Sequence, residues 1–149
     1  MLRLHPIEFL LRGIPEGFLF IISIYVFSKI NINNKKCIIS SLLYSANAYI
    51  IRLLPINYGV HTILSLLFLG VLVVYYNQID VIKSLRSIII IFLIQFLAEG
   101  VNVLILSAIN ININSFSNNP LMKSILGIPS LLISYLVVVI FYFINNKKK

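Results

Sequence analysis

Three polar side chains stand inside the most apolar stretch of this sequence. Ser87–Ile109 contains 23 residues and a single charge, Glu99. As a helix it would span about 34 Å, enough to cross the hydrocarbon core of a bilayer. Gln95, Glu99 and Asn102 fall at positions i, i+4 and i+7, so they share one face of that helix. A carboxylate at this depth costs roughly a few kcal/mol unless it is protonated, paired or near water. We therefore expect Glu99 to meet a partner on another helix.

Four further ionisable residues flank other apolar segments: Arg12 and Glu16 in the first, Arg52 at the end of the second, and His61 at the start of the third. Arg52 is the natural partner of Glu99 or of Glu16, because a guanidinium can hold a carboxylate through two hydrogen bonds. Such a cluster is either a ligand site or polar glue that fixes the order of the helices. Arg12 can also extend along the helix to reach lipid headgroups.

The composition identifies the class of protein. Hydrophobic residues make up 60% of the 149, charged residues 11%, and the mean hydropathy is +1.01, far outside the soluble range. The net charge of +8 comes from basic residues scattered between apolar runs, which indicates membrane topology and no nucleic-acid partner. A single cysteine, Cys37, excludes an intramolecular disulfide and a cysteine-cluster metal site. No catalytic, cofactor or metal-binding motif occurs, so we expect neither an enzyme nor a bound cofactor.

Hydropathy predicts an all-α, polytopic integral membrane bundle that forms one domain over residues 1–149. Five apolar segments are expected as spans, at Pro6–Lys29, Cys37–Leu54, Val60–Tyr76, Ser87–Ile109 and Pro129–Ile144. Pro15 either kinks the first segment or begins its membrane helix, which would place Glu16 in the first turn. Asn77–Arg86 is expected as a short helix at the membrane surface, and Leu121–Ile128 as a short interfacial helix.

Small residues recur four positions apart at Gly13/Gly17, Ser41/Ser45 and Ser130/Ser134. This spacing lets two membrane helices approach closely, because small side chains on one face bring the backbones together. We therefore expect close helix contacts at these three pairs.

The Lys and Arg residues predict the orientation. With five spans, one side of the membrane carries Arg3, Arg12, Arg52 and Lys123, while the other carries Lys29, Lys35, Lys36, Lys83, Arg86, Lys147, Lys148 and Lys149. The side richer in positive charge is the cytoplasmic one. The N-terminus is therefore expected outside and the C-terminus inside, with the ionisable cluster in the outer half of the bundle.

The runs LRGIPEGFLF, IIRLLPINYGVHTIL and FLAEGVN resemble small multi-pass membrane proteins of low-G+C Gram-positive bacteria. They are also similar to the membrane-sensor segments of peptide-responsive histidine kinases. In those kinases a dimerisation helix and an ATP-binding domain follow the segment, and these 149 residues contain neither. The resemblance implies a location in a bacterial cytoplasmic membrane.

Two functions remain open on these grounds. The first is a non-enzymatic sensor or accessory subunit that binds a small ligand, peptide or lipid at the outer side and signals to a membrane or cytoplasmic partner. The second is a small transporter or transporter subunit, in which Glu16 or Glu99 exchanges a proton. An intramembrane enzyme is disfavoured, because no nucleophile lies near a base in the expected topology.

Overall fold

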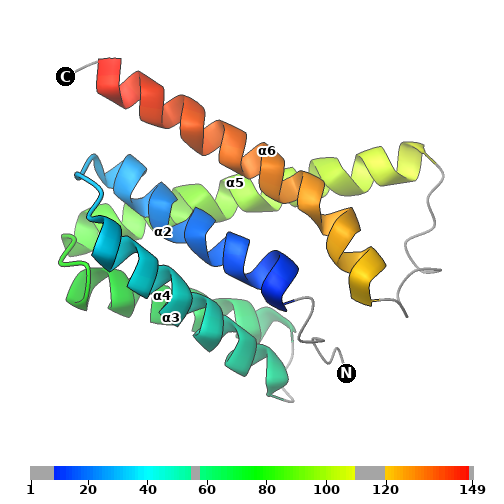
Figure 1. Cartoon of the computed structure of the whole chain (residues 1–149), viewed down its shortest axis with the longest axis horizontal. Coiled ribbons are helices and arrows are strands. Elements are labelled where there is room, and N and C mark those ends of the chain that lie inside the picture. The colour runs from blue at the N-terminus through cyan, green and yellow to red at the C-terminus, as the bar shows by residue number, and fades with distance from the viewer. Residues whose placement is uncertain (1–8, 55–57, 110–119, 148–149) are drawn as a thin grey trace.

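A computed structural model describes residues 9–54, 58–109 and 120–147, and these ranges are helical apart from their turns. The all-α expectation is confirmed. A single π-helical turn is followed by five α-helices, shown in Figure 1: η1 Phe9–Gly13, α2 Ile14–Ser28, α3 Asn34–Leu53, α4 Tyr58–Tyr75, α5 Val81–Ala108 and α6 Pro120–Lys147.

Three stretches within these helices are long and apolar enough to cross a membrane: Phe9–Phe27, Val81–Ala108 and Ser124–Asn145. The apolar part of α4, Gly59–Tyr75, is shorter, and α3 is more polar. The structure therefore supports a membrane protein with three candidate spans, fewer than the five expected. Several of the polar residues of α3 are serines that face the interior of the bundle: Ser40, Ser41 and Ser45 are buried.

The bundle is apolar outside and partly polar inside. α3 exposes Ile38, Leu42 and Ile50, and α4 exposes Ile63 and Leu67. Several buried hydroxyls bond to their own helix: the Oγ of Ser41, for example, donates to the Cys37 carbonyl, 2.7 Å away. A soluble domain has the opposite pattern, since large apolar side chains outside gain nothing in water. α3 and α4 thus expose large apolar side chains, a pattern that suits contact with a lipid bilayer.

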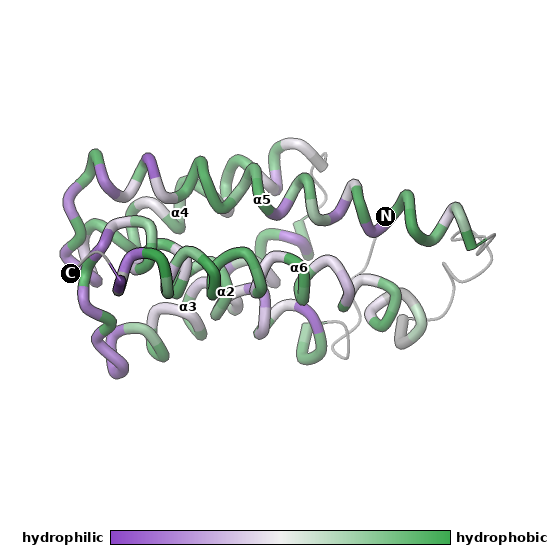
Figure 2. Tube along the Cα trace, turned by 90° about the horizontal axis from the view of Figure 1, so that it is seen from above, coloured by the Kyte–Doolittle hydropathy of each residue, from purple (hydrophilic) through white to green (hydrophobic). Residues whose placement is uncertain are grey.

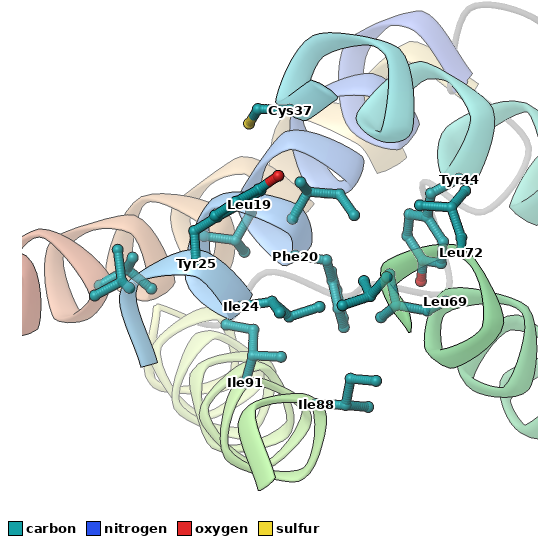
Figure 3. Close-up of a cluster of buried hydrophobic side chains, with 14 of the residues drawn as sticks. Leu19, Phe20, Ile24, Tyr25, Cys37, Tyr44, Leu69, Leu72, Ile88 and Ile91 are labelled. Carbon is teal, nitrogen blue, oxygen red and sulfur yellow. The ribbon is translucent and has the colours of Figure 1, made fainter. Parts of the chain in front are cut away.

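α2 occupies the centre of the bundle and packs against α3, α5 and α6. Leu19 and Ile24 on α2 are fully buried, together with Leu69 on α4 and Ile91 on α5. Figure 3 shows these side chains converging on one cluster. Gly17 lies directly against α3, because a Cβ added there would be 2.0 Å from the Ser45 Oγ. Gly17 from the Gly13/Gly17 pair and Ser45 from the Ser41/Ser45 pair therefore lie in a close contact between two helices, as expected from their spacing.

One end of the bundle gathers polar groups. The hydroxyls of Ser28 and Ser87 lie 2.9 Å apart, the Lys36 Nζ donates to the Gln78 Oε1 at 3.0 Å, and the Asn145 Nδ2 donates to the Val26 carbonyl at 3.0 Å. These contacts join the end of α2, the start of α3, the α4–α5 turn and the end of α6 (Figure 1). Figure 2 shows hydrophilic colour gathering at this same end, beside the C-terminus.

Two expected surface helices are wrong as separate elements. α5 begins at Val81, so most of the Asn77–Arg86 connector belongs to its first turns. α6 begins at Pro120 and continues without a break past Pro129, so the expected interfacial helix and the last span form one helix. Pro129 lacks an N–H, but the preceding turn gains side-chain donors: Ser130 donates to the Gly127 carbonyl and Asn102 to the Leu126 carbonyl. α6 bends in its first half (Figure 1).

Candidate functional site

A pocket of about 170 Å³ lies among α2, α3, α4 and α5, on the side where α2 begins and α3 ends. Five of its lining residues are among the seven proposed from sequence. The lining consists of Glu16 and Phe20 from α2, Tyr44 and Arg52 from α3, His61, Thr62, Ser65 and Leu66 from α4, and Phe92, Gln95, Phe96 and Glu99 from α5.

Local sequence places Glu16 and Arg52 each at the end of its own helix. Pro15 stands at the start of α2, so Glu16 lies in the first turn, where the helix dipole favours an anion. The residue before Pro55 is extended, as is usual before proline, and α3 therefore ends at Leu53. Arg52 thus occupies the last turn of α3, where the dipole favours a cation.

The Arg52–Glu16 ion pair is loose. An Arg52 Nη2 lies 3.6 Å from the Glu16 Oε1, too far for a hydrogen bond. The Glu16 side chain is only 14% exposed, whereas that of Arg52 is 36% exposed. Of the two partners that the sequence allows for Arg52, the structure brings it to Glu16. The pairing of Arg52 with Glu99 is wrong.

Glu99 is held instead by Arg12, which extends from the π-helical turn η1. The Arg12 Nη2 donates to the Glu99 Oε1 at 2.6 Å, and the Gln95 Nε2 reaches the same oxygen at 3.3 Å. This charge-assisted bond replaces the headgroup contact that was the alternative for Arg12. Gly127 makes the arrangement possible, because a Cβ there would lie 2.8 Å from the Arg12 Nη1.

Gln95 connects the pocket to α6. The Ser134 Oγ donates to the Gln95 Oε1 at 2.8 Å, so a chain of hydrogen bonds runs from Arg12 through Glu99 and Gln95 to Ser134. The Gln95 and Ser134 side chains are buried. Each link crosses between helices or along one helix face, and the chain therefore ties η1, α5 and α6 together.

His61 and Asn102 have different surroundings. His61 lines the pocket, and its Nδ1 is buried with no hydrogen-bond partner in the part of the chain that the structure describes. Asn102 lies outside the pocket lining and donates its Nδ2 to the Leu126 carbonyl of α6, 2.8 Å away. Asn102 thus acts as a helix–helix contact, while His61 remains a candidate for ligand contact.

The formal charges of the cluster balance. Two carboxylates, Glu16 and Glu99, face two guanidiniums, Arg12 and Arg52, and His61 is counted neutral. Across residues 9–54, 58–109 and 120–147, no group of three His, Cys, Asp or Glu side chains is arranged to hold a metal ion. The pocket presents side chains that can form ion pairs and hydrogen bonds.

Sequence reasoning missed the other half of the pocket wall. The aromatic residues Phe20, Tyr44, Phe92 and Phe96 line it, and Thr62 and Ser65 add hydroxyls from α4. The two hydroxyl residues follow His61 on one face of α4, a spacing that was visible in the sequence. The aromatic residues carried no such signal, since each one also suits a lipid-facing position.

Searches against protein families, curated proteins and solved structures find no match to this chain. The similarity to sensor segments therefore stays a prediction from the residues.

Proposed function

We propose that this protein is a non-enzymatic sensor or accessory subunit of a bacterial cytoplasmic membrane, whose pocket binds a small ligand or the end of a peptide. One observation carries the proposal: five ionisable or amide side chains from four helices line a single pocket inside a bundle with an apolar exterior. Ionisable groups within membrane helices are costly, and they commonly mark a ligand or ion path.

The size of the pocket limits the ligand. A volume of about 170 Å³ is close to that of a cavity able to hold one benzene ring. It is smaller than the roughly 300–1,000 Å³ of sites that enclose drug-sized ligands. The bound part is therefore a compact group, and anything larger must extend out of the pocket.

The location of the basic residues supports the expected orientation. The segments 29–36 and 83–86, together with Lys147, lie at the end of the bundle away from the pocket. In the five-span arrangement, α3 and α4 cross the membrane with their apolar faces toward lipid, the N-terminus is outside and the C-terminus is inside. The pocket then opens in the outer half.

The chain of hydrogen bonds from Glu99 to Ser134 offers a route for a signal. A ligand that moves Glu99 or Gln95 also disturbs the contact with α6, whose far end lies at the basic end of the bundle. A membrane or cytoplasmic partner that contacts α6 would sense this change. The physical basis is a connected set of hydrogen bonds that joins the pocket to α6, part-buried at Glu99 and buried between Gln95 and Ser134.

Proton-coupled transport is the second candidate. It is favoured by Glu16, which is 14% exposed and held by an ion pair without a hydrogen bond, and which shares the pocket with His61. In this alternative, Glu16 is the residue through which a proton would be exchanged for the substrate. Glu16→Gln would then abolish uptake, whereas in a sensor it would change the response of the partner and leave uptake unaffected.

The proposal requires water to reach the pocket from outside. We would test this with Ser65→Cys, in a Cys37→Ser background, in intact cells treated with a small, cationic, membrane-impermeant thiol reagent. The matched control is Leu67→Cys, two residues along α4, where the side chain is 62% exposed on the apolar outer face. The first variant should react at least about tenfold faster, because the reagent requires a thiolate and thiolates do not form in lipid. Equal rates, or no labelling of either, would refute the proposed pocket.

A further inference from the structure

The pocket opens sideways. α4 and α5 are in contact where Gly70 faces the Ile88 side chain, with a Cβ on Gly70 lying 3.8 Å from the Ile88 Cδ1. Two turns nearer the start of α4, Thr62 and Ser65 instead line the pocket opposite Phe96. Phe96 is a lining residue, yet it is 67% exposed, and Thr62 is exposed too. Part of the pocket rim therefore lies on the surface that faces lipid.

We propose that the pocket binds the zwitterionic headgroup of an amphiphile, with the apolar tail leaving between α4 and α5 beside Phe96. This proposal rests on the proposed function, since it names the ligand class of the same pocket. It adds that the ligand has both an anionic and a cationic group, and that its tail lies in the bilayer.

Arg52 is the group that receives the anion. A guanidinium has five N–H donors, and within the described residues Arg52 donates no hydrogen bond, its one ion-pair partner being 3.6 Å away. Arg12 is different: its Nη2 holds Glu99, its Nη1 lies against Gly127, and its Nε is buried. The two arginines thus have separate tasks, and only Arg52 lines the pocket.

Glu16 explains why the headgroup also needs a cation. An anion that takes over Arg52 would leave the carboxylate of Glu16, which is largely buried, without its counter-ion. The pocket would then hold two negative charges beside one arginine, and like charges at close range repel. An amine on the same headgroup can pair with Glu16, and the pocket then stays neutral. A phosphoethanolamine-like group, with about eight non-hydrogen atoms, is close in size to the ring that a cavity of this volume can hold.

The apolar part of the pocket rim provides a place for the hydrocarbon tail of the ligand. Phe92, Phe96 and Leu66 give the pocket an apolar wall that continues onto the outer surface of α5. A hydrocarbon chain placed there stays in apolar surroundings, as it was in the bilayer, so moving it there costs little free energy. A ligand without a tail would give up this contact.

The test measures protection of the Ser65→Cys variant, in the Cys37→Ser background, in a neutral detergent. Three probes are compared at equal concentration: lysophosphatidylethanolamine, which has headgroup and tail; O-phosphorylethanolamine, which has the headgroup alone; and lysophosphatidylglycerol, which has an anion and a tail but no amine. The first should slow labelling by about tenfold, as expected for a charge-assisted contact, and the other two by much less. Leu67→Cys serves as control, and its labelling rate should not change.

Arg52→Gln should remove the protection and Arg52→Lys should keep part of it. Normal labelling of the Arg52→Gln protein without probe would show that its pocket is still formed. If O-phosphorylethanolamine protects equally well, the ligand comes from water, so the pocket function stands and this proposal fails. The proposal is also overturned if lysophosphatidylglycerol protects as well as lysophosphatidylethanolamine does. It is likewise overturned if none of the three probes protects. Absence of labelling before any probe is added would refute the proposed function itself.

Discussion

Replacing Gly17 with alanine tests the closest helix contact in the bundle. A Cβ at this position would lie 2.0 Å from the Ser45 Oγ and 2.9 Å from the Ser41 carbonyl oxygen. Neither atom can move aside easily: one belongs to the α3 backbone, and the Ser45 Oγ is itself bonded to that same carbonyl at 2.8 Å. α2 and α3 must therefore separate, and Glu16, the neighbour of Gly17, moves away from Arg52.

The expected cost follows from two opposing terms. Overpacking a tight contact costs about 1–3 kcal/mol. Replacing glycine by alanine inside a helix returns about 1 kcal/mol. Gly17→Ala should thus lower the free energy of unfolding by up to about 2 kcal/mol. Gly100→Ala, in the middle of α5, is the matched control: no heavy atom lies within 4 Å of its added Cβ, so it should be neutral or stabilising.

Unfolding of the purified protein by titration with sodium dodecyl sulfate provides the assay, with helix content as readout. Adding Ser45→Ala to Gly17→Ala removes the 2.0 Å contact and should recover part of the loss. If Gly17→Ala is as stable as Gly100→Ala, α2 and α3 do not meet through this face, and the placement of Glu16 beside Arg52 loses its support.

Two further predictions concern the route to α6 and the orientation. Ser134→Ala removes the hydrogen bond to the Gln95 Oε1 and should cost about 1 kcal/mol in the same titration, whereas Ser107→Ala, an exposed serine of α5, should cost almost nothing. In intact cells that carry the protein in a Cys37→Ser background, an impermeant thiol reagent should label Asn114→Cys and leave Asn34→Cys unlabelled. The reverse pattern would place the pocket on the cytoplasmic side.

Hydropathy and proline positions predict much of this fold. Of the two expectations for Pro15, a helix start and a kink, the first places Glu16 in the first turn of α2 as found, and the π-helical turn η1 that runs into α2 fits the second. Pro55 correctly ended the helix that carries Arg52. Both rules act through the backbone of neighbouring residues, so no tertiary contact is needed to apply them. The same local reasoning gave the inward face of α5, where Gln95 and Asn102 are buried.

The pairing of charges could not be predicted in this way. Arg12 and Glu99 are 87 residues apart, and their contact depends on how η1, α5 and Gly127 of α6 pack together. The helix is continuous through Pro129, and Asn102 of α5 donates to the Leu126 carbonyl in the turn before this proline. The helix break expected at Pro129 was wrong, and local sequence rules contain no information about such contacts from a distant helix.

The central claim is that the two ion pairs have different tasks: Arg12 holds the bundle together, and Arg52 is available to a ligand. The most direct measurement compares the unfolding free energies of Arg12→Gln and Arg52→Gln without added ligand. Loss of the 2.6 Å bond to Glu99 should cost about 1.5–3 kcal/mol. Loss of the 3.6 Å contact should cost less than about 1 kcal/mol, because this ion pair has no hydrogen bond and the Arg52 side chain is 36% exposed. An Arg52→Gln protein that is as unstable as Arg12→Gln, or less stable, would contradict the claim.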